Sequence, residues 1–219
     1  MWRLASAFDR IRVRSMRLPL TACAAVTLLF VCGCSEAPKK TEKKEVAPAE
    51  PVKGRSALYQ MYNTARGWAP DVQVLRLQSI DLPDVKRERG KAAAWMAYFV
   101  TPERGRARSY TYSVIEAEGN LHKGVFAGLE ESWSGPHGAS APFPIAALKT
   151  DSDEVYETAL KKAADYEKKN PDKPISFLLE KTEQFPNPAW RVIWGESVGT
   201  SNFSIFVDAS TGTFLQTMR

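Results

Sequence analysis

An internal likeness is the feature that most limits how this chain can fold. Residues 94–100, AWMAYFV, resemble residues 189–195, AWRVIWG, and each stretch begins with an Ala-Trp pair. Residues 112–121 and 203–214 form a second matching pair, and both contain a glycine at a predicted turn. A helical pattern precedes the tryptophan in each half. The shared order predicts an α+β protein made of two tandem copies of one unit.

The first copy is predicted over residues 56–130 as a helix followed by strands. Apolar residues recur with the spacing of one helix face at Leu58, Met61, Tyr62 and Ala65. Ser56 is the predicted N-cap, and Gly67 is the predicted stop. Strand-like runs follow at 72–80, 92–101, 109–118 and 121–126.

The second copy is predicted over residues 150–219, after a linker at 131–149 that is rich in Gly, Pro and Ser. Asp151 caps its helix, and strands are expected at 175–182, 190–194, 203–208 and 213–217. Along 203–208 alternate residues give one apolar face, Phe203, Ile205 and Val207, and a second face with Ser204, Phe206 and Asp208. This alternation is typical of an antiparallel sheet that is covered on one face by a helix.

The end of the second copy resembles the end of a PepSY domain. The resemblance covers residues 190–214, where Val207, Asp208, Ala209, Thr211 and Gly212 match a V-D-A-x-T-G turn. The first copy lacks the aspartate and threonine of this turn. The resemblance implies tandem helix-plus-antiparallel-sheet units of PepSY or cystatin-like architecture, found outside the cytoplasm in binding or inhibitory roles. The resemblance implies no catalytic residues in this chain.

The amino terminus has the pattern of a signal peptide, assigned to residues 1–33. Five arginines and one aspartate precede an uncharged run at 18–31, which is too short for a membrane-spanning helix. Either Met1 or Met16 could start translation. Residues 31–34, VCGC, resemble a bacterial lipobox, which implies cleavage between Gly33 and Cys34 and a lipid on Cys34. An ordinary secretory signal or an uncleaved anchor is the alternative.

A disordered tether is predicted over residues 34–55. The stretch contains lysine, glutamate, proline and alanine with almost no large apolar residue, so it cannot offset the entropy of ordering. Ser35 follows the lipidated cysteine where an aspartate would imply retention at the inner membrane. We therefore expect a cell-envelope protein, anchored in the outer membrane and facing the periplasm or the cell surface.

Loss of the leader changes the charge and the thiol content. The full chain has 30 Lys and Arg against 25 Asp and Glu. The leader holds five arginines and one aspartate, so its removal leaves 25 basic and 24 acidic residues. A net charge near +1 gives no support for nucleic-acid binding. Cys23 and Cys32 leave with the leader, so no free thiol remains for a disulfide or a zinc site. The covalent lipid is the only group that we expect the protein to carry.

No catalytic or metal-binding residues are predicted. His122 lies in a strand-like segment and His137 in the linker, and neither has the rigid partners of a catalytic triad. Asp151, Asp153 and Glu154 are spaced like calcium ligands but lack the remaining oxygens of a calcium loop, so helix capping explains them better.

Partner contact is predicted at a basic, aromatic hairpin made of Arg104, Arg106, Arg108, Tyr110 and Tyr112. The functional interpretation of this hairpin is a contact site for an acidic partner. The alternative is an ordinary solvated turn. The function expected is a non-enzymatic binding module for a peptide, protease or envelope protein. The alternative is a small-ligand or lipid carrier, or an enzyme with an unrecognised site, which would need a pocket of roughly 300–1,000 Å³.

Replacement of the proposed anchor tests the envelope assignment. Cys34→Ser should abolish labelling by a fatty-acid probe and release the protein from the membrane fraction, because the anchor contributes about 0.8 kcal/mol per buried CH₂. Cys23→Ser is the matched control and should keep both properties. Residues 20–23, LTAC, also fit the letters of a lipobox but precede the apolar run. Loss of labelling in the Cys23 variant alone would place the lipobox at this earlier cysteine.

Overall fold

The computed structural model describes residues 48–119, 121–136 and 140–219. The predicted signal peptide, Gly33, Cys34 and most of the predicted tether lie outside these residues. The described part is an α+β fold with two helices and antiparallel sheets.

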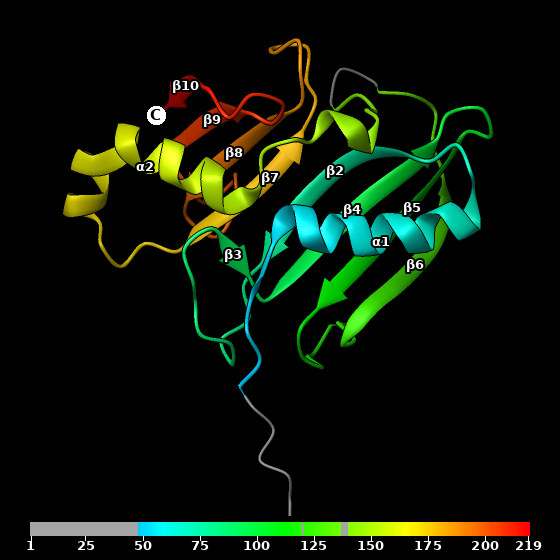
Figure 1. The fold of residues 1–219 in the computed structure, drawn as a ribbon, viewed down its shortest axis with the longest axis horizontal. Coiled ribbons are helices and arrows are strands. Elements are labelled where there is room, and N and C mark those ends of the chain that lie inside the picture. Colours follow the sequence, from blue (N-terminus) through cyan, green and yellow to red (C-terminus); the bar gives the residue numbers. More distant parts are fainter. Residues whose placement is uncertain (1–47, 120, 137–139) are drawn as a thin grey trace, which may run out of the picture. The chain divides into compact units, whose positions relative to one another are not determined.

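Eight strands form one antiparallel sheet in the order β10-β9-β8-β7-β2-β4-β5-β6 (Figure 1). The first four along the chain are β2 (Gln73–Ile80), β4 (Ala94–Thr101), β5 (Arg106–Ser113) and β6 (Gly124–Ser132). The other four are β7 (Ile175–Glu180), β8 (Ala189–Trp194), β9 (Ser204–Asp208) and β10 (Phe214–Met218). The two halves therefore share a continuous sheet, a point that the sequence had left open.

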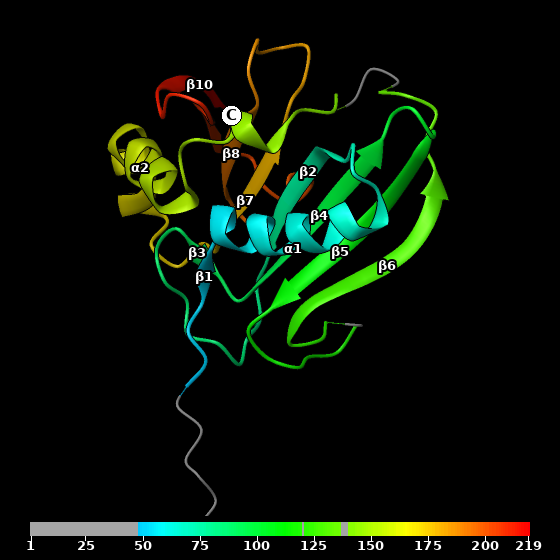
Figure 2. The ribbon, with the colours of Figure 1, turned by 45° about the vertical axis from the view of Figure 1, so that its right-hand side comes forward.

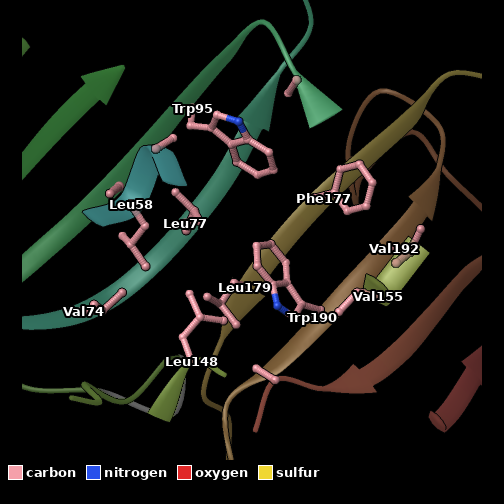
Figure 3. Close-up of a cluster of buried hydrophobic side chains, with 14 of the residues drawn as sticks. Leu58, Val74, Leu77, Trp95, Leu148, Val155, Phe177, Leu179, Trp190 and Val192 are labelled. Atoms are coloured by element: carbon pink, nitrogen blue, oxygen red, sulfur yellow. The ribbon is translucent and has the colours of Figure 1, made fainter. Parts of the chain in front are cut away.

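Both helices pack on the same face of this sheet (Figure 2). The helix α1 (Gly54–Trp68) lies against β2, β4, β5 and β6, and α2 (Ser152–Lys169) lies against β8 and β9. The buried side chains between helices and sheet form one core, whose central members are drawn in Figure 3. The order helix and then four long strands thus occurs twice along the chain.

A tryptophan occupies the second long strand of each half. Trp95 in β4 donates its indole N–H to the carbonyl of Val52 at 3.0 Å, and Trp190 in β8 donates to the carbonyl of Thr150 at 3.1 Å. Both acceptors stand two residues before the first residue of their helices. The two rings meet edge to face, with centroids 6.2 Å apart. Each indole therefore ties the entry of a helix to its strand.

The halves join through β2 and β7. Leu77 pairs with Leu179, and Gln78 pairs with Leu178. Beyond this point the backbone ladder ends, and the amide of Phe177 donates to Ser79 Oγ at 2.8 Å. The two strands diverge from here toward residues 81 and 175, and Figure 3 shows the buried side chains of Leu77, Leu179 and Phe177 on these strands.

The prediction that Ser56 caps the first helix is wrong. The helix begins at Gly54, and its first amides are satisfied by the start of the other helix. The amide of Gly54 donates to Ser152 Oγ at 2.8 Å, and the amide of Arg55 donates to Asp151 Oδ1 at 2.9 Å. A Cβ at position 54 would lie 2.7 Å from Trp190, so glycine permits this approach. Asp151 also caps its own helix, as predicted.

Two predicted boundaries need correction. Residues 52–55 are not tether, because β1 (Val52–Lys53) pairs with β3 (Lys91–Ala92) and α1 follows directly. The linker does not start at 131, because β6 continues to Ser132. Its later part belongs to the core: Phe143 is only 1% exposed, and the short 3₁₀ turn η1 (Ile145–Ala147) follows it.

The predicted turn around Asp208 is confirmed. The carboxylate accepts the amides of Ser210 at 2.7 Å and Thr211 at 3.0 Å, and Asn187 donates to it at 3.1 Å. Gly212 has a φ of 72°, in the left-handed region that glycine permits. Burial by itself would raise the pKa of Asp208, but these hydrogen bonds outweigh it and hold the pKa below its ordinary value.

Ser152 should be critical for stability. Ser152→Ala leaves two buried backbone groups without a partner, the amide of Gly54 and the carbonyl of Gly90, which accepts from the hydroxyl at 2.6 Å. We expect the free energy of unfolding in urea to fall by about 2–4 kcal/mol. Ser56→Ala is the control and should change it by less than about 0.5 kcal/mol. Similar losses in both variants would contradict this capping arrangement.

The Asp208 turn should contribute to stability in a pH-dependent way. Asp208→Asn should lower the free energy of unfolding by about 1 kcal/mol at neutral pH. Because the folded pKa is depressed, the benefit of the charge is complete above the unfolded pKa of about 3.9 and is lost as the pH falls through the folded value. Urea unfolding at several pH values should therefore show the gap narrowing in acid. The exposed Asp84→Asn serves as the control, and a pH-independent gap at Asp208 would contradict the prediction.

Candidate functional site

The candidate site is a pocket of about 350 Å³ beside the junction of the two halves, here called the junction pocket. It lies between the connection 81–93, which follows β2, and the turn 170–174, which precedes β7. The diverging ends of β2 and β7 contribute Ser79 and Ile175 to its wall. Figure 1 shows the backbone of these two connections, one leading to β3 and the other following α2.

The floor of the junction pocket is largely apolar. Phe177 and Tyr156 are both buried, and Ile175 lies beside them. Burial, together with the charge of Glu167, raises the pKa of the Tyr156 phenol, whereas Arg89 opposes that shift. The phenol is therefore neutral at physiological pH, and the guanidinium of Arg89 is close enough to act on it. A ligand in this pocket would meet an aromatic floor with a cation near its edge.

The rim of the pocket carries more positive than negative charge. Two of its ion pairs are internal: Arg87 Nε donates to Asp81 at 2.8 Å, and Lys91 lies 2.5 Å from Glu88. The remaining cations on the rim are Lys86, Arg89 and Lys173, and the remaining carboxylate is Asp172. Within the described ranges the partners of Lys173 are neutral, Tyr166 and Asn202. Three cations against one carboxylate favour an anionic ligand.

A second accessible feature is the outer edge of the sheet. Among the described residues, no strand pairs with the free side of β6. Its side chains include Leu129, which is 85% exposed, and the half-exposed Phe126. Glu130 and Glu131 also lie here, and such charges commonly protect an edge from unwanted pairing. This edge is the weaker candidate, because its charged side chains disfavour pairing with a further strand.

The predicted basic hairpin is only partly available for contact. Tyr110 is 1% exposed and packs edge to face on Phe99, so it cannot touch a partner, and this part of the prediction is wrong. Its side chain points under α1, where Tyr112 is also partly buried. The reason is strand alternation, which places positions 110 and 112 on the helix-covered face.

The three arginines of that hairpin have partners within the chain. Arg104 lies over the ring of Trp68, and Arg106 Nε is 3.4 Å from Glu130. Arg108 donates to the carbonyl of Gly128 at 2.8 Å. Contact of these arginines with an acidic partner stays a prediction.

The other polar residues considered from the sequence have local roles. His122 pairs with Glu116 at 2.5 Å on the surface, and His137 lies outside the described residues. Asp153 pairs with Lys53 at 2.5 Å. In the described part of the chain there is no cluster of metal-ligating residues and no helix long and apolar enough to cross a membrane.

Sequence patterns did not reveal the junction pocket. Its rim comes from two connections without regular periodicity, and they meet only because β2 and β7 pair. The one local signal was the density of charge between residues 81 and 91.

Comparison with known proteins gives a distant likeness. No protein-family model and no curated protein matches the sequence. A solved structure described as "a putative lipoprotein (CD1622) from Clostridium difficile 630" is similar, with a TM-score of 0.48 and 14% identity. The match covers 79% of this chain and 95% of that chain. A likeness at this distance does not establish a family or an activity for this chain.

Proposed function

We propose that this protein is a lipid-anchored, extracytoplasmic binding module for a peptide segment of an envelope partner. The anchor follows from the lipobox-like residues 31–34, with the lipid on Cys34. Ser35 favours the outer membrane, and the lysine- and glutamate-rich tether would hold the folded part away from the bilayer. In this proposal the protein acts by binding and carries no catalytic residue.

Two PepSY-like copies would form the folded part. Three relations support this: the repeated order of elements, the matching indole bonds of Trp95 and Trp190, and the central pairing of β2 with β7. The position of each tryptophan relative to the next strand is also repeated. Trp95 pairs with Tyr112, and Trp190 pairs with Val207, in the third long strand of each half. Duplication of one gene segment would produce this arrangement.

The observation that carries the binding proposal is the junction pocket. It combines an aromatic floor with a cationic rim, and it lies at the joint between the two proposed copies. Ligand sites commonly form at such joints, with mostly apolar walls and a few polar groups. A peptide with an apolar side chain and nearby carboxylates fits both surfaces.

A small anionic ligand is the second candidate. The volume of about 350 Å³ lies at the lower end of the range for small-molecule pockets. In that case the protein would be a carrier, and no protein partner would contact the rim.

Crosslinking in intact bacterial cells tests the proposal. A benzophenone amino acid at Lys86 on the rim should form a covalent adduct with an envelope protein or peptide. The same substitution at Lys161, an exposed position on α2 outside the pocket, is the matched control and should yield much less of that adduct. Mass spectrometry then identifies the adduct.

Two outcomes would count against it. Equal adducts at both positions would mean that the pocket is not the contact site. No adduct at Lys86, together with a bound small anion in the purified protein, would favour the carrier.

A further inference from the structure

We infer that the junction pocket is an unfilled strand slot, into which an extended acidic peptide segment inserts and pairs with the backbone of Ile175. This inference rests on the proposed peptide-binding function and specifies its mode and ligand. Its basis is a second slot in the same sheet, which the chain fills with its own linker.

The filled slot lies at the other end of the β2–β7 junction. There the linker inserts where the strands diverge: the amides and carbonyls of Val74 and Phe143 exchange hydrogen bonds of 2.9 and 2.8 Å. The amide of Ala141 donates to the carbonyl of Lys181 at 2.7 Å. Both contacts are antiparallel bridges, and the Phe143 side chain is buried in the core. A short extended segment thus acts as an added strand.

The junction pocket occupies the equivalent position in the other half. Val74 in β2 pairs with Phe99 in β4, and Ile175 in β7 pairs with Trp194 in β8. Phe99 follows Trp95 by the same interval as Trp194 follows Trp190, so Ile175 is the counterpart of Val74. Counted from the tryptophan partners Ser79 and Leu179, Asp81 is the counterpart of Lys181, and a bulge between Val74 and Arg76 accounts for the one extra residue in β2. Ile175 and Asp81 both line the pocket.

The backbone of Ile175 is oriented to receive a strand. Backbone groups of alternate residues in a strand point to the same side. The amide of Phe177 points toward β2, where it meets Ser79, and so the amide and carbonyl of Ile175 face the same gap. On the opposite side, the neighbouring Pro174 carbonyl is taken by the amide of Gly195. In the described part of the chain nothing pairs with Ile175 across the gap.

The side chains around the slot select the chemistry of the segment. The aromatic floor of Phe177 and Tyr156 suits an apolar side chain, in the place that Phe143 takes in the filled slot. The cations Lys86, Arg89 and Lys173, which have no carboxylate partner among the described residues, would attract carboxylates on either side of it. The ligand class is therefore an extended peptide with one apolar residue between acidic ones.

Binding of a designed peptide to the purified full chain tests the slot. The probe is fluorescein-labelled Asp-Ala-Pro-Phe-Pro-Asp, which copies residues 141–144 between aspartates. Fluorescence anisotropy should show saturable binding that weakens with salt. A peptide with N-methylphenylalanine cannot donate its backbone hydrogen and should bind about tenfold more weakly. This comparison needs no protein variant, so folding defects cannot confuse it.

A charge reversal tests the rim. Arg89→Glu should weaken binding by about tenfold, whereas Lys161→Glu, on the exposed surface of α2, should leave it unchanged. Replacing the two aspartates of the peptide with lysines should weaken binding to the unaltered chain.

Several results would overturn the inference. Equal affinity of the N-methylated peptide would exclude strand pairing, and unaltered affinity in Arg89→Glu would exclude the acidic preference. If no peptide binds, yet crosslinking at Lys86 in cells still captures a protein, the slot is refuted while the proposed function stands. If the peptide binds as expected but the cellular crosslink fails, the slot stands and the proposed envelope partner is refuted.

Discussion

Three aromatic rings at the joint between the halves are the contact on which the rest of the fold depends. Trp95, Trp190 and Phe177 lie with ring centroids 6.0 to 6.4 Å apart, and large buried rings of this kind dominate core energetics. The two indoles also fix where each helix begins. Because Gly54 leaves room for them, the two helix starts can meet and share the cap that Ser152 provides.

The same rings connect the core to the candidate site. Phe177 packs against both tryptophans and also forms the floor of the junction pocket. The floor of the pocket is thus part of the buried aromatic core, and its charged rim is carried by surface connections. The two ends of the β2–β7 junction differ in whether an added segment fills the gap between the strands. At one end Phe143 completes the sheet, and at the other Ile175 faces open space.

The sequence predicted the helices and most strands, because these depend on local apolar periodicity. It could not predict that one sheet spans both halves, since the pairing of Leu77 with Leu179 is non-local. It also missed that Tyr110 is buried, because the neighbouring arginines made the hairpin look exposed. The sequence also did not predict the junction pocket, because tertiary pairing brings together two connections that have no periodic pattern of their own.

Amide hydrogen exchange at Ile175 and Val74 tests the central claim most directly. The Val74 amide is bonded to the Phe143 carbonyl at 2.9 Å, so its exchange should be slow in the free protein. The Ile175 amide should exchange rapidly until an acidic peptide is added, and slowly afterwards. Slow exchange at Ile175 without any peptide, or no change on its addition, would contradict an unfilled slot at the joint of the two halves.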